Sequence, residues 1–357
     1  MISLSWRRRP PPHPAPLEPH VPAPSTREDA RLPLHIVADD AELGLARGRL
    51  VVQAGGSKMT FRLEEISLVG LHGGARATIP CLQALAREGV PVALFSRSGY
   101  LLGQIVDTTS SVSSTRRAQY AAAADAKTSL RLAKILVEGK LRGTARLARR
   151  RCGANAAVTN TLLRSLTSVA RCDSAASLRG IEGAAAAAWY AAWPAFFDEC
   201  GPLFRFDGRS RRPPRDAVNA LLSYLYAVTA GTAAAAANLA GLDQNVGFYH
   251  AERPGRPALA LDLVEPLRPV LVDTAVIAAI RNREFSHACF ETQPEGGVSL
   301  SLDGRRRALG LIERRLSTVL SYDGADMTWR AAISRHAQLL ARGLRDGRLD
   351  VSVPAPK

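Results

Sequence analysis

This chain of 357 residues has few cysteines and no long apolar runs, and both shortages narrow its class. Its five cysteines are scattered, with no Cys-x-x-Cys pair and no zinc-ligand spacing. We therefore expect reduced cysteines in a cytoplasmic protein instead of a disulfide framework. No segment approaches the roughly 20 uninterrupted apolar residues of a membrane-spanning helix. The N-terminal arginines run into prolines, which is not the pattern of a signal peptide, so no membrane association is expected.

Acidic residues are too few to balance the basic ones. The chain has 47 lysines and arginines against 32 aspartates and glutamates, a formal net charge of +15. An excess of this size indicates a polyanionic partner, and with membranes set aside nucleic acid is the main candidate. A phosphate loop of the form Gly-x-x-x-x-Gly-Lys-Ser/Thr is also missing. Its absence counts against an enzyme that acts on a small phosphorylated substrate.

The length allows about two domains at roughly 150 residues each, and the pattern predicts an α+β protein. A small β-rich N-terminal domain is expected to precede a larger all-α catalytic domain. The predicted divisions are a disordered tail rich in proline and arginine at 1–31, the β-rich domain at 32–106, a polar hinge at 107–115, the helical domain at 116–345 and a C-terminal tail at 346–357.

Short apolar runs between turn residues predict a meander of strands in the N-terminal domain. The runs are Leu34–Val37, Glu42–Ala46, Arg49–Gln53, Lys58–Arg62, Ile66–Leu71, Ala77–Pro80 and Val90–Ser96. One helix is predicted at Ile79–Arg87, and His72 is interpreted as a turn residue. Further on, Asp216 is expected to cap a helix that runs through Tyr226. Other helices are predicted at Ala184–Trp193, Asp273–Ile280 and Thr328–Leu344.

One segment, residues 116–151, is strongly basic. It holds eleven lysines and arginines against Asp125 and Glu138, a net charge of +9. Leucines and alanines at helical spacing place these cations on the outer face of helices. A solvated face is the alternative, but a single-signed run favours contact with phosphates. The candidate DNA-binding residues are Arg116, Arg117, Lys127, Arg131, Lys134, Lys140, Arg142 and Arg146.

A few acids and one histidine stand beside glycines and aromatic residues. Glu182 lies between Gly180 and Gly183, and His250 ends a Gly-Phe-Tyr-His segment. Asp262 and Glu265 are three residues apart, so on a helix both face the same way. Carboxylates with an imidazole suit Mg²⁺ or Mn²⁺, and a basic protein needs such acids to cut or join DNA, not merely to hold it.

Each of these residues also has a plainer interpretation. Glu182 could be a solvated glutamate that gains from a helix dipole, and His250 a packed or surface histidine. Either Asp262 or Glu265 could cap a helix or pair with Arg268. The residues alone leave these alternatives open.

Three blocks of sequence resemble the CRISPR adaptation integrase family, the metal-dependent endonuclease subunit of the spacer-acquisition complex. They are the Pro-Pro-Arg-Asp-Ala-Val-Asn-Ala-Leu-Leu-Ser-Tyr block ending at Tyr224, the Gly-Leu-Asp and Gly-Phe-Tyr-His block ending at His250, and Leu-Asp-Leu-Val-Glu-Pro-Leu-Arg-Pro ending at Pro269. The resemblance extends from about Leu32 to Arg345. Tyr249 and Val264 depart from the usual family residues, but neither change removes a liganding atom.

The resemblance implies a set of residue roles and partners. The metal ligands would be Glu182, His250 and Asp262, with Glu265 at a further acidic position, as a direct ligand or as a residue that orients one. The cofactor would be Mg²⁺ or Mn²⁺. The N-terminal domain would pair with its copy in a homodimer. Expected partners are double-stranded and branched DNA (the prespacer and the CRISPR repeat), the small second adaptation subunit and an accessory CRISPR exonuclease.

The expected function is therefore that of a metal-dependent DNA endonuclease and integrase. It would insert spacer DNA into a CRISPR array by 3′-hydroxyl attack on the repeat backbone, and would cleave branched DNA. Two other functions compete with it. A non-catalytic, architectural DNA-binding protein would explain the basic helices but not the acids. An unrelated metal-dependent phosphohydrolase would explain the acids but not the basic surface.

Overall fold

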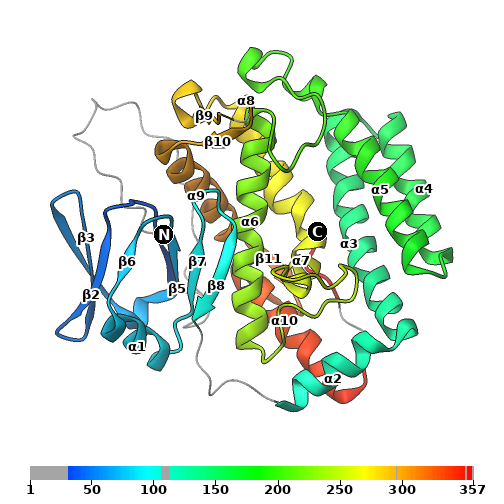
Figure 1. Cartoon of the computed structure of the whole chain (residues 1–357). Helices are drawn as coiled ribbons and strands as arrows, with labels where there is room; N and C mark the ends of the chain where they lie inside the picture. The colour runs from blue at the N-terminus through cyan, green and yellow to red at the C-terminus, as the bar shows by residue number, and fades with distance from the viewer. Residues whose placement is uncertain (1–30, 106–112, 295, 350–351, 356–357) are drawn as a thin grey trace.

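The computed structural model describes residues 31–105, 113–294, 296–349 and 352–355 (Figure 1). The predicted tail, apart from Arg31, lies outside the described residues, and so does most of the predicted hinge. A β-rich N-terminal part lies against a larger helical part, which confirms the α+β class.

Two four-stranded sheets make up the N-terminal part. The first has the order β1 (Leu32–Ile36), β5 (Ile66–His72), β7 (Val92–Phe95) and β8 (Leu101–Ile105). The second has the order β4 (Ser57–Arg62), β3 (Arg49–Ala54), β2 (Glu42–Ala46) and β6 (Arg76–Ala77). Helix α1 covers Ile79–Arg87.

The strands were expected to form a meander, and that expectation is wrong for the first sheet. Strand β5 pairs in parallel with both β1 and β7, and only β8 is antiparallel to its neighbour. The burial of β5 gives the reason, since all but one of its seven residues are buried. Strands that are buried on both faces favour a parallel arrangement between covering layers.

Helices dominate the rest of the chain (Figure 1). They are α2 (Ser113–Ala124), α3 (Ala126–Cys152), α4 (Ala157–Arg171), α5 (Ala175–Ala191), α6 (Ala217–Leu239), α7 (Ala258–Val264), α8 (Thr274–Arg281), α9 (Leu302–Leu316) and α10 (Trp329–Asp346). Two short hairpins were not predicted, β9–β10 (Phe290–Thr292 and Val298–Leu300) and β11–β12 (Val319–Tyr322 and Ala325–Thr328). Helix α2 begins inside the predicted hinge, and α5 begins nine residues before the predicted Ala184.

Helix α6 runs through the centre of the molecule, with the sheets on one side of it and α3, α4 and α5 on the other (Figure 1). As expected, Asp216 caps it, because Oδ1 accepts a hydrogen bond from the backbone N–H of Asn219 at 2.7 Å. The helix continues to Leu239, well past the predicted end at Tyr226. It is the one described helix long and apolar enough to cross a membrane, yet 83% of its apolar window is buried inside the protein. The apolar composition of α6 is therefore explained by its place in the core.

The first sheet packs closely against α6. A Cβ atom added to Gly231 of α6 would come within 2.5 Å of the Phe95 ring, so glycine permits the approach of β7. His72 stacks on Phe95 and its Nε2 lies 3.0 Å from Nδ1 of His35. His72 is the last residue of strand β5 and is fully buried, so its interpretation as a turn residue is wrong. His35 in turn faces Glu313 of α9, which links the sheet to the helical part.

Candidate active site

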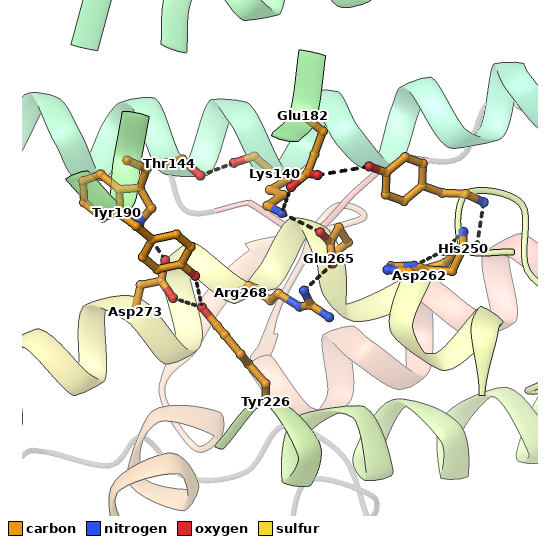
Figure 2. A network of polar contacts seen from close by, with 12 residues as sticks. Lys140, Thr144, Glu182, Tyr190, Tyr226, His250, Asp262, Glu265, Arg268 and Asp273 are labelled. Atoms are coloured by element: carbon orange, nitrogen blue, oxygen red, sulfur yellow. Dashed lines mark hydrogen bonds and ion pairs between the residues drawn. The ribbon is translucent and has the colours of Figure 1, made fainter. Parts of the chain in front are cut away.

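Lys140 of α3 joins two of the predicted acids. Its Nζ donates to Oε1 of Glu182, on α5, and to Oε1 of Glu265, just after α7, the latter at 2.5 Å (Figure 2). The three side chains are largely buried, with exposed fractions of 14% for Lys140, 17% for Glu182 and 3% for Glu265. Glu182 and Glu265 lie 42 and 125 positions after Lys140 in the sequence, yet the fold brings both to the same ammonium group.

Two glycines explain why α3 comes so close to the second acid. A Cβ atom at Gly139 would lie 3.0 Å from Cβ of Pro266, and one at Gly143 would lie 3.5 Å from Cγ1 of Val270. These glycines are four residues apart, so they lie on one face of α3. The bare backbone on this face allows the segment that begins with Glu265 to pack against the helix. Lys140 stands beside Gly139 and so meets the Glu265 carboxylate.

The remaining oxygens of the two carboxylates are held by other groups. The Tyr249 hydroxyl donates to Oε2 of Glu182 at 3.2 Å, and Arg268 pairs with Oε2 of Glu265 at 2.9 Å. Burial alone would raise the pKa of Glu265, but the charges of Arg268 and Lys140 outweigh it and lower that pKa well below the ordinary value. The two cations therefore favour the carboxylate form of Glu265. Arg268 is the partner that was considered for it from the sequence.

Asp262 and His250 form the other half of the site. Oδ2 of Asp262 accepts the backbone N–H groups of Phe248 and Tyr249 at 2.6 and 3.0 Å, and Oδ1 accepts that of His250 at 3.0 Å. Oδ1 also lies 2.7 Å from Nδ1 of His250. Asp262 is fully buried, whereas the His250 side chain is 12% exposed. Because Nδ1 faces Asp262, Nε2 is the nitrogen left to bind a ligand.

The turn that leads into His250 is held from α2. The amide of Gln119 donates to the carbonyls of Asp243 and Val246 at 2.8 and 2.7 Å, and its oxygen accepts the N–H of Asp243. The Tyr120 hydroxyl also donates to Oδ2 of Asp243 at 2.9 Å. These contacts fix the backbone just before the Gly-Phe-Tyr-His segment.

The predicted ligands thus fall into two pairs, and Tyr249 connects them. Lys140 bridges Glu182 and Glu265, while Asp262 holds His250 (Figure 2). Nowhere in the described ranges do three or more histidines, cysteines or acids lie close enough together to hold a metal as they stand. The donor chemistry nevertheless fits a hard divalent ion, because two carboxylates already hold a positive charge between them beside an imidazole.

The predicted DNA-binding residues separate into two groups. Arg117, Lys127, Arg131, Arg142 and Arg146 are exposed on α2 and α3, as expected for an outer basic face. Arg116 and Lys134 are half-buried, and Nζ of Lys134 donates to the carbonyl of Ala170 at 3.2 Å. Arg142 pairs with Glu138 one turn away. Lys140 does not lie on the outer face, contrary to expectation.

The site role of Lys140 was missed although the sequence carries a signal for it. The buried residues Val137 and Thr144 stand three positions before and four after it, so all three share one face of α3. A second missed group lies beside the site. Asp273 accepts hydrogen bonds from Trp189 Nε1 at 3.0 Å and from the Tyr226 hydroxyl. Burial raises the pKa of Asp273, and these donors only partly offset that effect.

Comparison with solved structures defines the class of fold. A casposase bound to an integration product has a TM-score of 0.78 and 24% identity, and the match covers 89% of this chain and 92% of the casposase. A Cas1 protein from Thermotoga maritima has a TM-score of 0.77 and 18% identity, covering 91% of this chain and all of the other, 100%. The arrangement of sheets and helices is thus the one found in Cas1 proteins and casposases.

Sequence comparison gives the family. The model of the family described as CRISPR associated protein Cas1 matches residues 34–314. The "CRISPR-associated endonuclease Cas1 1" of Thermus thermophilus is 38% identical over 291 residues, which are 81% of this chain and 88% of that protein. This chain belongs to the Cas1 family.

Some relatives are considerably longer than this chain. A "CRISPR-associated exonuclease Cas4/endonuclease Cas1 fusion" of Rhodospirillum rubrum is 38% identical over 321 residues, covering 87% of this chain but 55% of the fusion. A fusion of the same description from Geobacter sulfurreducens is 35% identical, and 60% of it is covered. The chain therefore spans somewhat more than half the length of these two relatives.

Proposed function

We propose that this chain is a divalent-metal-dependent DNA endonuclease and integrase that inserts spacer DNA into a CRISPR array. The observation that carries the proposal is the pair of largely buried carboxylates, Glu182 and Glu265, which share the Lys140 cation and are joined to the His250 segment through Tyr249. Burying two carboxylates together is unfavourable unless they hold positive charge. A site of this kind serves phosphoryl transfer, and the basic surface of α2 and α3 provides for a polyanionic substrate.

We assign the ligand set from the contacts of each acid. Glu182, Glu265 and Nε2 of His250 would hold Mg²⁺ or Mn²⁺. Asp262 was expected among the ligands, but its two oxygens already accept three backbone N–H groups and face the His250 ring. Its proposed role is to orient His250, and Glu265 takes the place of a direct ligand. This division reverses the roles expected for Asp262 and Glu265.

Other side chains around the site would position the ligands and hold the DNA. When bound, the metal would neutralise the phosphodiester and lower the barrier to attack by a hydroxyl. The Tyr249 hydroxyl keeps Glu182 in place, and Arg268 keeps Glu265 ionised and in place. The exposed cations of α2 and α3 would hold the DNA backbone without selecting a sequence.

The proposed partners follow from the proposed reaction. They are a prespacer duplex, the CRISPR repeat, a second copy of the chain and the small second adaptation subunit. A solved structure named "Cas6-RT-Cas1--Cas2 complex" shares the fold at a TM-score of 0.78, and the fusion relatives are named for an exonuclease, Cas4, as well as for Cas1. These names support a second subunit and an accessory exonuclease as partners.

Cleavage of branched DNA with and without Mn²⁺ tests the proposed function. Wild-type protein should cleave and join strands only with the metal, and Glu182→Gln should do neither. Glu284→Gln serves as the matched control, because Glu284 pairs with Arg314 at the surface. Binding without metal-dependent cleavage would instead favour an architectural protein. Turnover of small phosphate esters with no action on DNA would favour an unrelated phosphohydrolase.

A further inference from the structure

Lys140 occupies the position between the carboxylates that the proposed ligand set would give to a divalent ion. Its Nζ contacts Oε1 of both Glu182 and Glu265, and its side chain is 14% exposed. An ammonium is compact and sits on a flexible four-carbon stem, so it can act as a mobile point charge. No contact fixes it except those to the same oxygens that a metal would use, so far as the described residues record hydrogen bonds from this group.

The two carboxylates do not depend on Lys140 alone for their positions. Oε2 of Glu182 is held by the Tyr249 hydroxyl, and Oε2 of Glu265 by Arg268. If the ammonium withdraws, both acids keep one fixed oxygen and turn the other toward the vacated position. The arrangement therefore remains a binding site for a cation after Lys140 has left it.

The structure also provides a place for the withdrawn ammonium. A cavity of about 20 Å³ adjoins Lys140 and is lined by Tyr190, Tyr226 and Asp273 among others. Roughly 10–15 Å³ is enough for one water molecule, and an ammonium group is of similar size. Asp273 supplies carboxyl oxygens at this cavity, where they accept hydrogen bonds from Trp189 and Tyr226, and Arg211 and Arg268 line it as well.

We propose that Lys140 is a built-in placeholder cation, which holds Glu182 and Glu265 together in the metal-free protein and releases them when a divalent ion binds. The inference rests on the proposed function, because it assumes that these acids are ligands. The consequence of this role is that the Lys140 ammonium and the divalent ion compete for the same carboxylate oxygens. Metal binding to the wild-type protein must displace the ammonium, so the lysine stabilises the empty site and weakens metal affinity at the same time.

Direct binding measurements on the full chain without DNA test this competition. We would measure Mn²⁺ affinity by calorimetry and the thermal unfolding midpoint with and without Mn²⁺. Lys140→Met should unfold at a lower temperature without metal, bind Mn²⁺ several-fold more tightly, and show a larger Mn²⁺-induced rise in midpoint than wild type. Lys140→Arg should bind Mn²⁺ several-fold more weakly, because its guanidinium holds carboxylates in a bidentate fork.

Two further variants separate the possible failures. Arg342→Met removes an exposed cation of α10, away from the proposed site, and should leave Mn²⁺ affinity unchanged. Glu182→Gln should lose Mn²⁺ binding, and normal binding by this variant would overturn the proposed ligand set itself. If Glu182→Gln loses binding while Lys140→Met binds no more tightly than wild type, the ligand set stands and the placeholder role is wrong. Should Lys140→Met fail to fold, Lys140→Arg decides, since wild-type or tighter Mn²⁺ binding by it contradicts the competition.

Discussion

Asp262 holds His250 at two points, since Oδ1 accepts the backbone N–H of His250 at 3.0 Å and lies 2.7 Å from its ring Nδ1. The same carboxylate also accepts the two preceding backbone N–H groups through Oδ2. One buried acid therefore fixes both the loop and the ring orientation of the imidazole. This arrangement separates the residues that would bind metal from the residue that positions one of them.

Asp262→Asn should reduce strand transfer roughly 10–100-fold and be partly rescued by excess Mn²⁺, the usual result when a residue that orients a ligand is lost. The amide can accept fewer of the hydrogen bonds that hold the loop, so His250 becomes less ordered. Metal titrations of strand transfer measure the effect. His250→Ala should instead fall to background at every Mn²⁺ concentration. An Asp262→Asn variant that is equally inactive at saturating Mn²⁺ would make Asp262 a ligand after all.

Glu265→Gln should lose activity to background without rescue by metal. The change removes a charge that Lys140 and Arg268 hold in place, and it removes a proposed liganding oxygen beside Glu182. Activity across a Mn²⁺ titration is the measurement, with Glu284→Gln as the surface control. A dependence that merely shifts to higher Mn²⁺ would return Glu265 to an orienting role.

Charge reversal on the outer basic face should weaken DNA binding without changing sequence preference. The variant combines Arg117→Glu, Lys127→Glu and Arg146→Glu, three exposed cations of α2 and α3. Because each phosphate contact releases counterions, log affinity against log salt should fall less steeply than in wild type. Fluorescence anisotropy on several duplexes measures both effects. Arg342→Glu, an exposed cation of α10, is the control, and an equal loss from it would remove the special role of the basic face.

Stability should fall in acid because of Glu313, which is buried where α9 meets the first sheet. Burial raises its pKa, but Arg330 and His35 outweigh burial and bring the pKa to about 2, against 4.5 for an ordinary glutamate. The folded protein therefore binds fewer protons than the unfolded chain between these values. The resulting stabilisation, roughly 3 kcal/mol, is complete above about pH 5 and disappears as the pH falls toward 2. Urea unfolding of wild type and Glu313→Gln between pH 7 and 3 measures it.

The acid-stability prediction is checked by comparing how the free energy of unfolding changes with pH in wild type and in two variants. Glu313→Gln should be less stable at pH 7 and should lose less stability than wild type on acidification. Glu64→Gln alters a carboxylate in an exposed pair and should follow the wild-type curve. Parallel curves for Glu313→Gln and wild type would show that Glu313 carries no acid sensitivity.

Local patterns in the sequence were sufficient to predict the position of many helices and strands. Strand β2 at Glu42–Ala46 and helix α1 at Ile79–Arg87 have the predicted bounds, because alternation, helical spacing and flanking turn residues act within a few positions. The parallel pairing of β5 with β1 and β7 could not be predicted this way. Strand pairing depends on burial by the helical part, which lies far along the chain.

In the candidate site, too, the sequence predicts which residues take part but not how they are arranged. Glu182, His250, Asp262 and Glu265 could be selected from residue type and context. Their division into two pairs depends on distances between α3, α5 and α7, and these follow from the close packing at Gly139 and Gly143. Lys140 was grouped with the surface cations because its charge was counted before its helical face was considered. Spacing relative to Val137 and Thr144 would have placed it inside.

The three hydrogen bonds from the Gln119 side chain to the backbone of Asp243 and Val246 limit which fragments of the chain can fold. A fragment that begins at Ala126 would contain α3 and all four predicted site residues, yet it would leave three backbone groups of the turn before His250 without their partner. Such a fragment should fold poorly around the imidazole even though every proposed ligand is present. The smallest autonomous catalytic unit must therefore include α2, whose Gln119 amide and Tyr120 hydroxyl both reach across to a loop far along the chain.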